Sequence, residues 1–151
     1  MKTKKRQTLI YHDLGFPIEL INVPLKKVLG IWVLDIDMNK LQLVVIRALV
    51  HKPYLLTGAE LKFIRKYLKL STTEFGKKLG ISHAAIVKWE KEQTHPSPAQ
   101  EVYIRMFVIE SLKNSELTKV FAEITPEKLA MSKNEPKSIL PIDLKDLGLA
   151  V

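Results

Sequence analysis

Residues 61–96 read LKFIRKYLKLSTTEFGKKLGISHAAIVKWEKEQTHP and carry the strongest structural signals of the 151-residue chain. Apolar residues recur in this stretch at helical spacing. Ser71 is followed three residues later by Glu74, which is the arrangement of a capping box, and Ser82 precedes a second apolar run. Gly80, between the two runs, is typical of a helix end. The stretch therefore predicts two short helices joined by a tight turn.

Helices are also expected on both sides of this pair. Thr57 and Glu60 form another capping box, which opens a helix that runs to about Lys69. A further helix is expected over residues 99–112, where the apolar positions are Val102, Met106, Phe107 and Ile109. Residues 53–112 are thus predicted to be helical almost throughout.

The first third of the chain has a different pattern. Residues 8–12, 17–23 and 31–36 are rich in β-branched, aromatic and other apolar residues and are separated by glycine-containing turns, which predicts a small antiparallel sheet. From Asp37 to about His51 the apolar period becomes that of an amphipathic helix. We expect the sheet to be held by apolar packing of Ile10, Ile18, Leu20, Ile31, Trp32 and Val33.

Periodicity weakens toward the end of the chain. A short helix is expected over residues 115–124 and another from Pro126, while residues 132–151 are expected to be a flexible tail or an arm that docks elsewhere. The predicted fold class is α+β. The three predicted parts are a β-rich domain (1–52), a helical domain (53–112), and C-terminal helices and tail for dimerisation or partner binding (113–151).

The charge balance favours an anionic partner. The chain has 24 Lys and Arg against 16 Asp and Glu, a net charge of +8 and a pI near 9.6, and the excess positive charge lies in residues 1–95. A basic domain of this kind points first to nucleic acid.

Several classes of function find no support in the residues. Cys is absent, which excludes disulfides, thiolate zinc sites and a cysteine nucleophile. The four histidines lack metal-ligand spacing and no serine lies in a nucleophile-elbow motif, so we expect no metal, no cofactor and no enzyme activity. The apolar run at residues 41–50 is far shorter than the roughly 20 residues a bilayer requires, and no signal peptide is evident. A cytoplasmic protein without membrane contact is expected.

The two short helices have the pattern of a helix-turn-helix, which presents its second helix to the major groove of double-stranded DNA. The face opposite Ile86 and Trp89 is then the reading face, and Lys88 is its best donor to a base edge. The predicted base-contacting residues are His83, Ala84, Ala85, Val87 and Lys88. The predicted phosphate-contacting residues are Ser71, Thr72, Thr73, Lys77, Lys78, Lys91 and Thr94.

The same stretch resembles the lambda-repressor/Cro class of helix-turn-helix domains, whose pattern runs Leu, Arg, a short helix, Leu-Gly-Ile-Ser and Trp-Glu. The resemblance implies a structural ion pair between Arg65 and Glu90. Two positions depart from the class. Thr72 stands where Gln is usual, which bears on one phosphate contact, and Glu92 stands where Gly is usual, which bears on the exit from the third helix.

A wider resemblance covers about residues 8–112. The segments YHDLGFPIELINV (11–23) and LLTGAELKFIRKYLKLS (55–71) resemble MqsA/YgiT-type antitoxins and related regulators, which join a small N-terminal domain to such a DNA-binding domain. Those relatives hold the N-terminal domain on zinc with two Cys-x-x-Cys pairs. No Cys exists here, so the zinc role does not carry over.

These observations lead to a main hypothesis and an alternative. The main one is a sequence-specific transcriptional regulator, a repressor or autoregulator, that binds DNA as a homodimer because one short recognition helix gives little specificity. The alternative is an antitoxin of a type II toxin-antitoxin pair, which also masks a protein toxin through its N-terminal domain or its apolar tail (139–151). A mobile-element control protein with no protein partner is a third interpretation.

Overall fold

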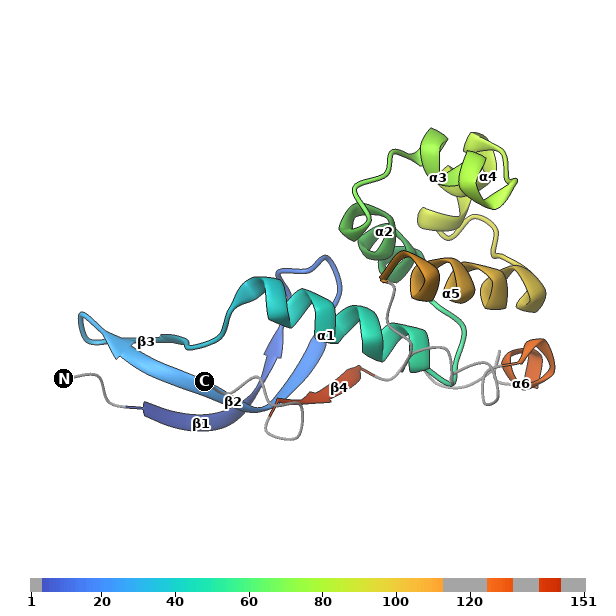
Figure 1. Cartoon of the computed structure of the whole chain (residues 1–151). Helices are drawn as coiled ribbons and strands as arrows, with labels where there is room; N and C mark the ends of the chain where they lie inside the picture. The colour runs from blue at the N-terminus through green and yellow to red at the C-terminus, as the bar shows by residue number, and fades with distance from the viewer. Residues whose placement is uncertain (1–3, 113–124, 132–138, 145–151) are drawn as a thin grey trace. The chain divides into compact units, whose positions relative to one another are not determined.

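The computed structural model describes residues 4–112, 125–131 and 139–144, and they form an α+β fold (Figure 1). The chain divides into two compact units, Met1–Ala48 with Lys137–Val151, and Leu49–Pro136. These units group the residues differently from the three functional parts expected above, which stay a prediction. No helix among the described residues is long and apolar enough to cross a membrane.

The first unit is built on a four-stranded sheet. Its strands are β1 (Lys4–Tyr11), β2 (Ile18–Val28), β3 (Ile31–Leu34) and β4 (Leu140–Asp143). β1 and β3 pair antiparallel with β2, as the expected antiparallel sheet requires, and β4 adds a parallel pair with the first half of β2. The tail therefore contributes an arm that docks on the sheet, held also by hydrogen bonds from Asn22 Nδ2 to the Asp143 carboxylate.

One face of this sheet carries the core of the unit. Ile18 and Leu20 are fully buried, as expected, and Ile142 of β4 is also buried. The expected burial of Ile10, Ile31 and Val33 is wrong, because all three are exposed. Alternate residues of a strand point to opposite faces, and the strand register places Ile10 opposite Glu19, Ile31 opposite Val28, and Val33 opposite Lys26, on the uncovered face. The remaining buried apolar side chains of the unit come largely from β2 and from α1 (Met38–His51), and are Phe16, Val23, Leu25, Leu41, Val44, Val45, Ile46 and Leu144.

Truncating the buried side chain of β4 tests whether the tail is part of this core. Ile142→Ala should lower the free energy of unfolding by about 2–5 kcal/mol, because it removes buried methyl groups and leaves a cavity. Met131→Ala, at a side chain that is 85% exposed, should change it little. Urea denaturation of both variants measures the difference. Equal midpoints for the two variants would contradict the placement of β4.

The second unit is helical. Its elements are α2 (Gly58–Tyr67), α3 (Thr72–Leu79), α4 (His83–Glu90), α5 (Pro98–Leu112) and α6 (Pro126–Met131). The expected helices over residues 53–112, and the one beginning at Pro126, are therefore confirmed within a few residues. The helix expected over residues 115–124 lies outside the described residues.

Local signals fix where these helices begin and end. Thr57 Oγ1 accepts a hydrogen bond from the Glu60 amide at 3.2 Å, and Ser71 Oγ accepts one from the Glu74 amide at 3.0 Å. In turn, the carboxylate of each glutamate accepts a hydrogen bond from the backbone amide of its cap residue. Gly80 ends α3 with φ of 70°, in the left-handed region. Both predicted capping boxes are thus confirmed.

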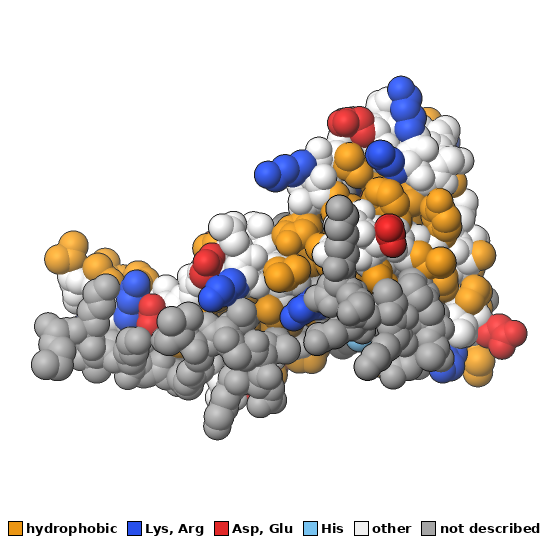
Figure 2. Space-filling view, in the orientation of Figure 1, with side chains coloured by type: hydrophobic (Ala, Val, Ile, Leu, Met, Phe, Trp, Pro, Cys, Tyr) orange, Lys and Arg blue, Asp and Glu red, His pale blue; other side chains and the backbone are white. Residues whose placement is uncertain are grey.

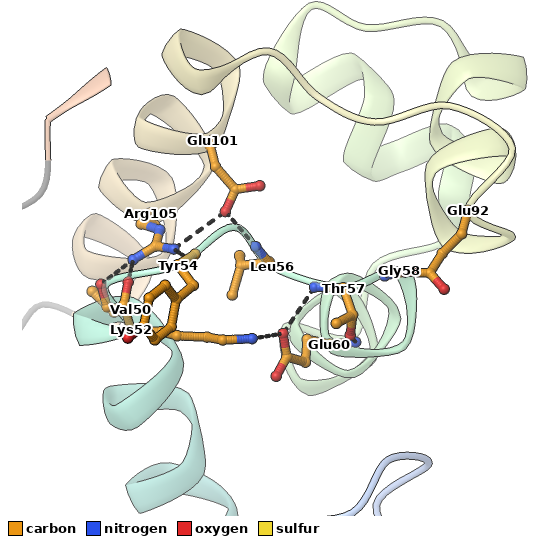
Figure 3. A network of polar contacts seen from close by, with 10 residues as sticks. All are labelled: Val50, Lys52, Tyr54, Leu56, Thr57, Gly58, Glu60, Glu92, Glu101 and Arg105. Atoms are coloured by element: carbon orange, nitrogen blue, oxygen red, sulfur yellow. Dashed lines mark hydrogen bonds and ion pairs between the residues drawn. The ribbon is translucent and has the colours of Figure 1, made fainter. Parts of the chain in front are cut away.

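The expected apolar face of α5 is only partly right. Ile109 is buried, but Met106 is exposed, and the charged Glu101 and Arg105 occupy buried positions together with apolar residues of the same helix. The buried polar residues bond to one another and to the backbone, as Figure 3 shows, although Arg105 Nε has no hydrogen-bond partner among the described residues. The Arg105 guanidinium donates to the carbonyl oxygens of Val50, Lys52 and Tyr54 and to Glu101, and Glu101 accepts from the Leu56 amide.

This network anchors the segment that leads into α2. Val50 lies in the last turn of α1, where carbonyl oxygens have no partner within the helix, so the Arg105 side chain supplies the missing donors. Burial raises the pKa of the Glu101 carboxyl, while Arg105 and the Leu56 amide oppose that rise. Nearby, Lys52 Nζ and Glu60 Oε1 form an ion pair at 2.7 Å. The segment is therefore held to α2 and α5 by charged hydrogen bonds.

Candidate nucleic-acid interface

The α3–α4 pair has its own small core. Phe75 and Leu79 of α3 and Ile86 and Trp89 of α4 are buried, and Phe75 makes an edge-to-face contact with Phe107 of α5, with ring centroids 6.2 Å apart. The four side chains recur at helical spacing, so each helix keeps one apolar face inward and leaves the opposite face to solvent.

A close approach of the backbone sets the turn between the two helices. A Cβ at Gly76 would overlap the carbonyl oxygen of Ile81, so only glycine fits at this position. The Ile81 amide donates to the Gly76 carbonyl at 2.8 Å and closes the turn. Ser82 then caps α4 by accepting from the Ala85 amide at 3.1 Å. The start of α4 is thereby fixed against the middle of α3.

The residues expected to touch bases all lie outside the core. His83, Ala84 and Lys88 are exposed, and Ala85 and Val87 are half-buried. The residues expected to touch phosphates are also accessible: Ser71, Thr73, Lys77, Lys78, Lys91 and Thr94 are exposed, and Thr72 is half-buried. The structure brings the two sets together on α3, α4 and the segment that follows. Contact with DNA stays a prediction for each of them.

A hydrogen bond that sequence reasoning missed joins the two sets. Thr72 Oγ1 and His83 Nδ1 are 2.8 Å apart, and Thr73 Oγ1 lies 3.5 Å from the same nitrogen. The bond links the first residue of α3 to the first residue of α4. Because Nδ1 is engaged, Nε2 is the ring nitrogen that remains available to a ligand. Thr72, where the class has Gln, thus orients the His83 ring.

Arg65 and Glu90 form the ion pair that the resemblance implies. Arg65 Nε lies 2.6 Å from Glu90 Oε2 and Nη2 lies 3.0 Å from Oε1, so the contact is bidentate, and Nη1 donates to the Leu70 carbonyl. Both side chains are about nine-tenths buried. A bidentate pair fixes geometry as well as charge. The pair ties α2 to the last residue of α4.

Glu92 provides the exit from α4 that glycine provides in the class. Its φ is 59°, in the left-handed region that favours glycine. Its carboxylate accepts from the Gly58 amide at 3.3 Å, at the start of α2. A Cβ on Gly58 would overlap the backbone oxygens of Trp89 and Glu90, so α2 and α4 touch closely here. The departure at position 92 therefore places a non-glycine residue in a left-handed conformation at this exit.

The comparisons with known proteins agree with this geometry. The Helix-turn-helix family model matches residues 61–100, which run from within α2 into the start of α5. Neither the curated proteins nor the solved structures include a match to the chain. The match supports a helix-turn-helix domain over residues 61–100, a kind of domain found in DNA-binding transcription regulators. The resemblance to MqsA/YgiT-type antitoxins stays a prediction.

The cap of α3 gives a pH dependence with a defined sign. The backbone and side chain of Ser71 donate to the Glu74 carboxylate, with Lys77 and Lys78 nearby, and together they hold the pKa of Glu74 below its usual 4.5. A lowered pKa in the folded state means that the ionised carboxylate stabilises the fold above about pH 4.5, and that this contribution is lost as pH falls through the lowered pKa.

Glu74→Gln isolates that contribution, because Gln keeps the capping box but does not titrate. The variant should be less stable than the wild type near neutral pH, and the difference should shrink as the pH falls below 4.5 and the carboxylate becomes protonated. Urea midpoints of both proteins, measured from neutral pH into acid, provide the measurement. A stability difference that does not change with pH would rule out the assigned role of the carboxylate.

Proposed function

We propose that the protein is a sequence-specific transcriptional regulator, a repressor or autoregulator, that reads the major groove with α4. The observation that carries the proposal is the exposed face of α4, from His83 to Lys88, within the segment that matches the helix-turn-helix model. Its side chains are small or basic, which suits close approach to base edges. The Arg65–Glu90 pair and the α3–α4 turn keep this face in one orientation.

The roles along this surface follow from position and chemistry. Lys88 is exposed in the second turn of α4 and donates to guanine O6 or N7, and Ala84 contacts a thymine methyl. The backbone amides at the start of α3, beside Ser71 and Thr73, bind a DNA phosphate. His83 Nε2 donates to the DNA strand that carries this phosphate. Lys77 and Lys78 add an electrostatic attraction to the phosphates that does not depend on the DNA sequence.

Two classes of alanine variant separate base reading from phosphate attraction. Lys88→Ala should weaken binding to the cognate site by about 1–3 kcal/mol and relax base preference at one position. Lys77→Ala and Lys78→Ala should weaken binding to all sequences alike and reduce the slope of affinity against salt. Titrations of cognate and random duplexes at several salt concentrations measure both effects. Equal losses on the two duplexes for Lys88→Ala would remove the base-reading role.

We further propose that two copies bind together. α4 has eight residues and reads few base pairs, so one copy cannot select a site among many competitors. Selection from a random DNA pool should therefore return a palindrome with half-sites about 10 base pairs apart, or a multiple of that spacing, and mass measurements should find two chains per duplex. A consensus without symmetry, bound by one chain, would contradict the homodimer.

The antitoxin interpretation is the alternative function. This interpretation lets the apolar tail (139–151) bind a toxin, but part of that tail already packs within the first unit. Ile142 and Leu144 are buried there, and β4 is paired with β2. A toxin would therefore have to bind elsewhere in the N-terminal unit or displace this strand. The regulator function is the one that the geometry of the described residues supports best.

A further inference from the structure

The turn between β2 and β3 has an unfavourable residue at its tip. Val28 pairs with Ile31, so Leu29 and Gly30 form a two-residue turn, with φ of 51° and 82°. Turns with two positive φ values favour Asn, Asp or Gly at the first position, and a bulky apolar residue there is strained. The Leu29 side chain is also 97% exposed. Leu29 therefore lowers the stability of the fold in two ways: its backbone conformation is strained, and its apolar side chain is exposed to water.

Apolar exposure continues from the tip along one face of the hairpin. Val28 and Ile31 are paired neighbours on that face, Val33 follows two residues later, and Ile31 is 66% exposed. Figure 2 shows hydrophobic side chains gathered over this end of the first unit. A contiguous apolar surface at a strained turn indicates a contact with another molecule. We call the segment Val28–Val33 the apolar tip.

Basic residues lie on β2 next to the apolar tip and on the neighbouring strand β1. Lys26 and Lys27 directly precede it, and the backbone register places Lys4, Lys5 and Arg6 of β1 opposite Lys26, Leu25 and Pro24. Residues 1–12 and 24–34 contain no Asp or Glu, and the nearest carboxylate, Asp35, lies 3.6 Å from Lys26 Nζ. Lys27 Nζ lies 5.8 Å from the centroid of the Trp32 ring. This end of the sheet therefore combines exposed apolar side chains with an excess of basic residues over acidic ones.

We propose that this hairpin is a second DNA-binding element, in which Leu29 enters the minor groove as a wedge between two base pairs. Apolar side chains on a rigid support partly unstack a base step, while neighbouring basic residues bind the phosphates on either side. The proposal rests on the proposed function, because it assigns a further contact to the same ligand. It accounts both for the conformation of Leu29 and for the charge around it.

Other occupants fit the surface less well. The cores of protein interfaces are depleted in Lys, whereas interfaces with DNA are strongly positive. A second copy of the hairpin would bring like charges together across the contact. A lipid surface rewards apolar area and positive charge but gains nothing from a strained turn that fixes the direction of one side chain. DNA uses all three features.

The contact predicts a sequence dependence outside the site that α4 reads. Pyrimidine–purine steps such as TA and CA unstack most easily, so a wedge prefers them. The hairpin then kinks the duplex and contributes to site selection without hydrogen bonds to bases.

Leu29→Asn tests the proposal in the full-length protein. Asn accepts the left-handed conformation, so the variant should fold and show a higher Tm than the wild type. The probes are two duplexes: the selected site with at least one further helical turn on each side and dyes at both ends, and the same site without the added DNA. The wild type should bind the long duplex about tenfold more tightly than the short one and bend it, as seen by energy transfer. Leu29→Asn should bind both duplexes alike and leave the long one unbent.

Two controls distinguish the possible failures. Met131→Asn removes another exposed apolar side chain and should behave as the wild type, whereas Lys88→Ala should lose base preference but keep the preference for the long duplex. The wedge is overturned if Leu29→Asn bends and binds the long duplex as the wild type does. The wedge is also overturned if Leu29→Asn keeps wild-type DNA binding and bending and loses only binding to vesicles of anionic phospholipid, or only self-association. Failure of the proposed function is a separate result, in which Lys88→Ala matches the wild type on both duplexes.

Discussion

The close approach of Gly76 to the Ile81 carbonyl is the constraint on which the exposed face of α4 depends. Because no side chain separates them, the chain can turn within three residues after α3, and the left-handed Gly80 completes the reversal. The start of α4 is thereby set, and its helical period then decides which side chains face inward. Ile86 and Trp89 enter the core with Phe75, so His83, Ala84 and Lys88 are turned to solvent. A backbone contact thus determines which residues can meet a ligand.

Polar contacts hold this arrangement from both ends. The Arg65–Glu90 pair fixes the last residue of α4 to α2, and the bond between Thr72 and His83 links the first residues of α3 and α4. Farther from the exposed face of α4, the Arg105 guanidinium donates hydrogen bonds to three backbone carbonyl oxygens and to Glu101. We expect these buried, hydrogen-bonded charges to specify one arrangement more than they add to stability. Such rigidity suits a reading surface, because a helix that is already oriented loses less entropy when it binds.

Local signals made much of this fold predictable from sequence. The capping boxes at Thr57 and Ser71 and the helix end at Gly80 depend on neighbouring residues only, and they located the helices within a few residues. The parallel pairing of Leu140–Asp143 with β2 joins residues more than a hundred positions apart, so no local pattern announces it. Apolar character also misplaced Ile31 and Val33, because burial depends on which face of the sheet is covered. The Thr72–His83 hydrogen bond could not be predicted in this way, because it depends on the distance between two helices, which the spacing of residues along the chain does not give.

Mapping the contact residue by residue tests the central claim most directly. Amide and side-chain NMR signals of the full-length protein would be followed during titration with a duplex selected from a random pool. The account predicts the largest changes at the start of α3 and along the exposed side of α4, with Ala84 and Lys88 among them and with the buried Ile86 affected less. Binding that leaves the signals of α4 unchanged, while other parts of the chain respond, would contradict it.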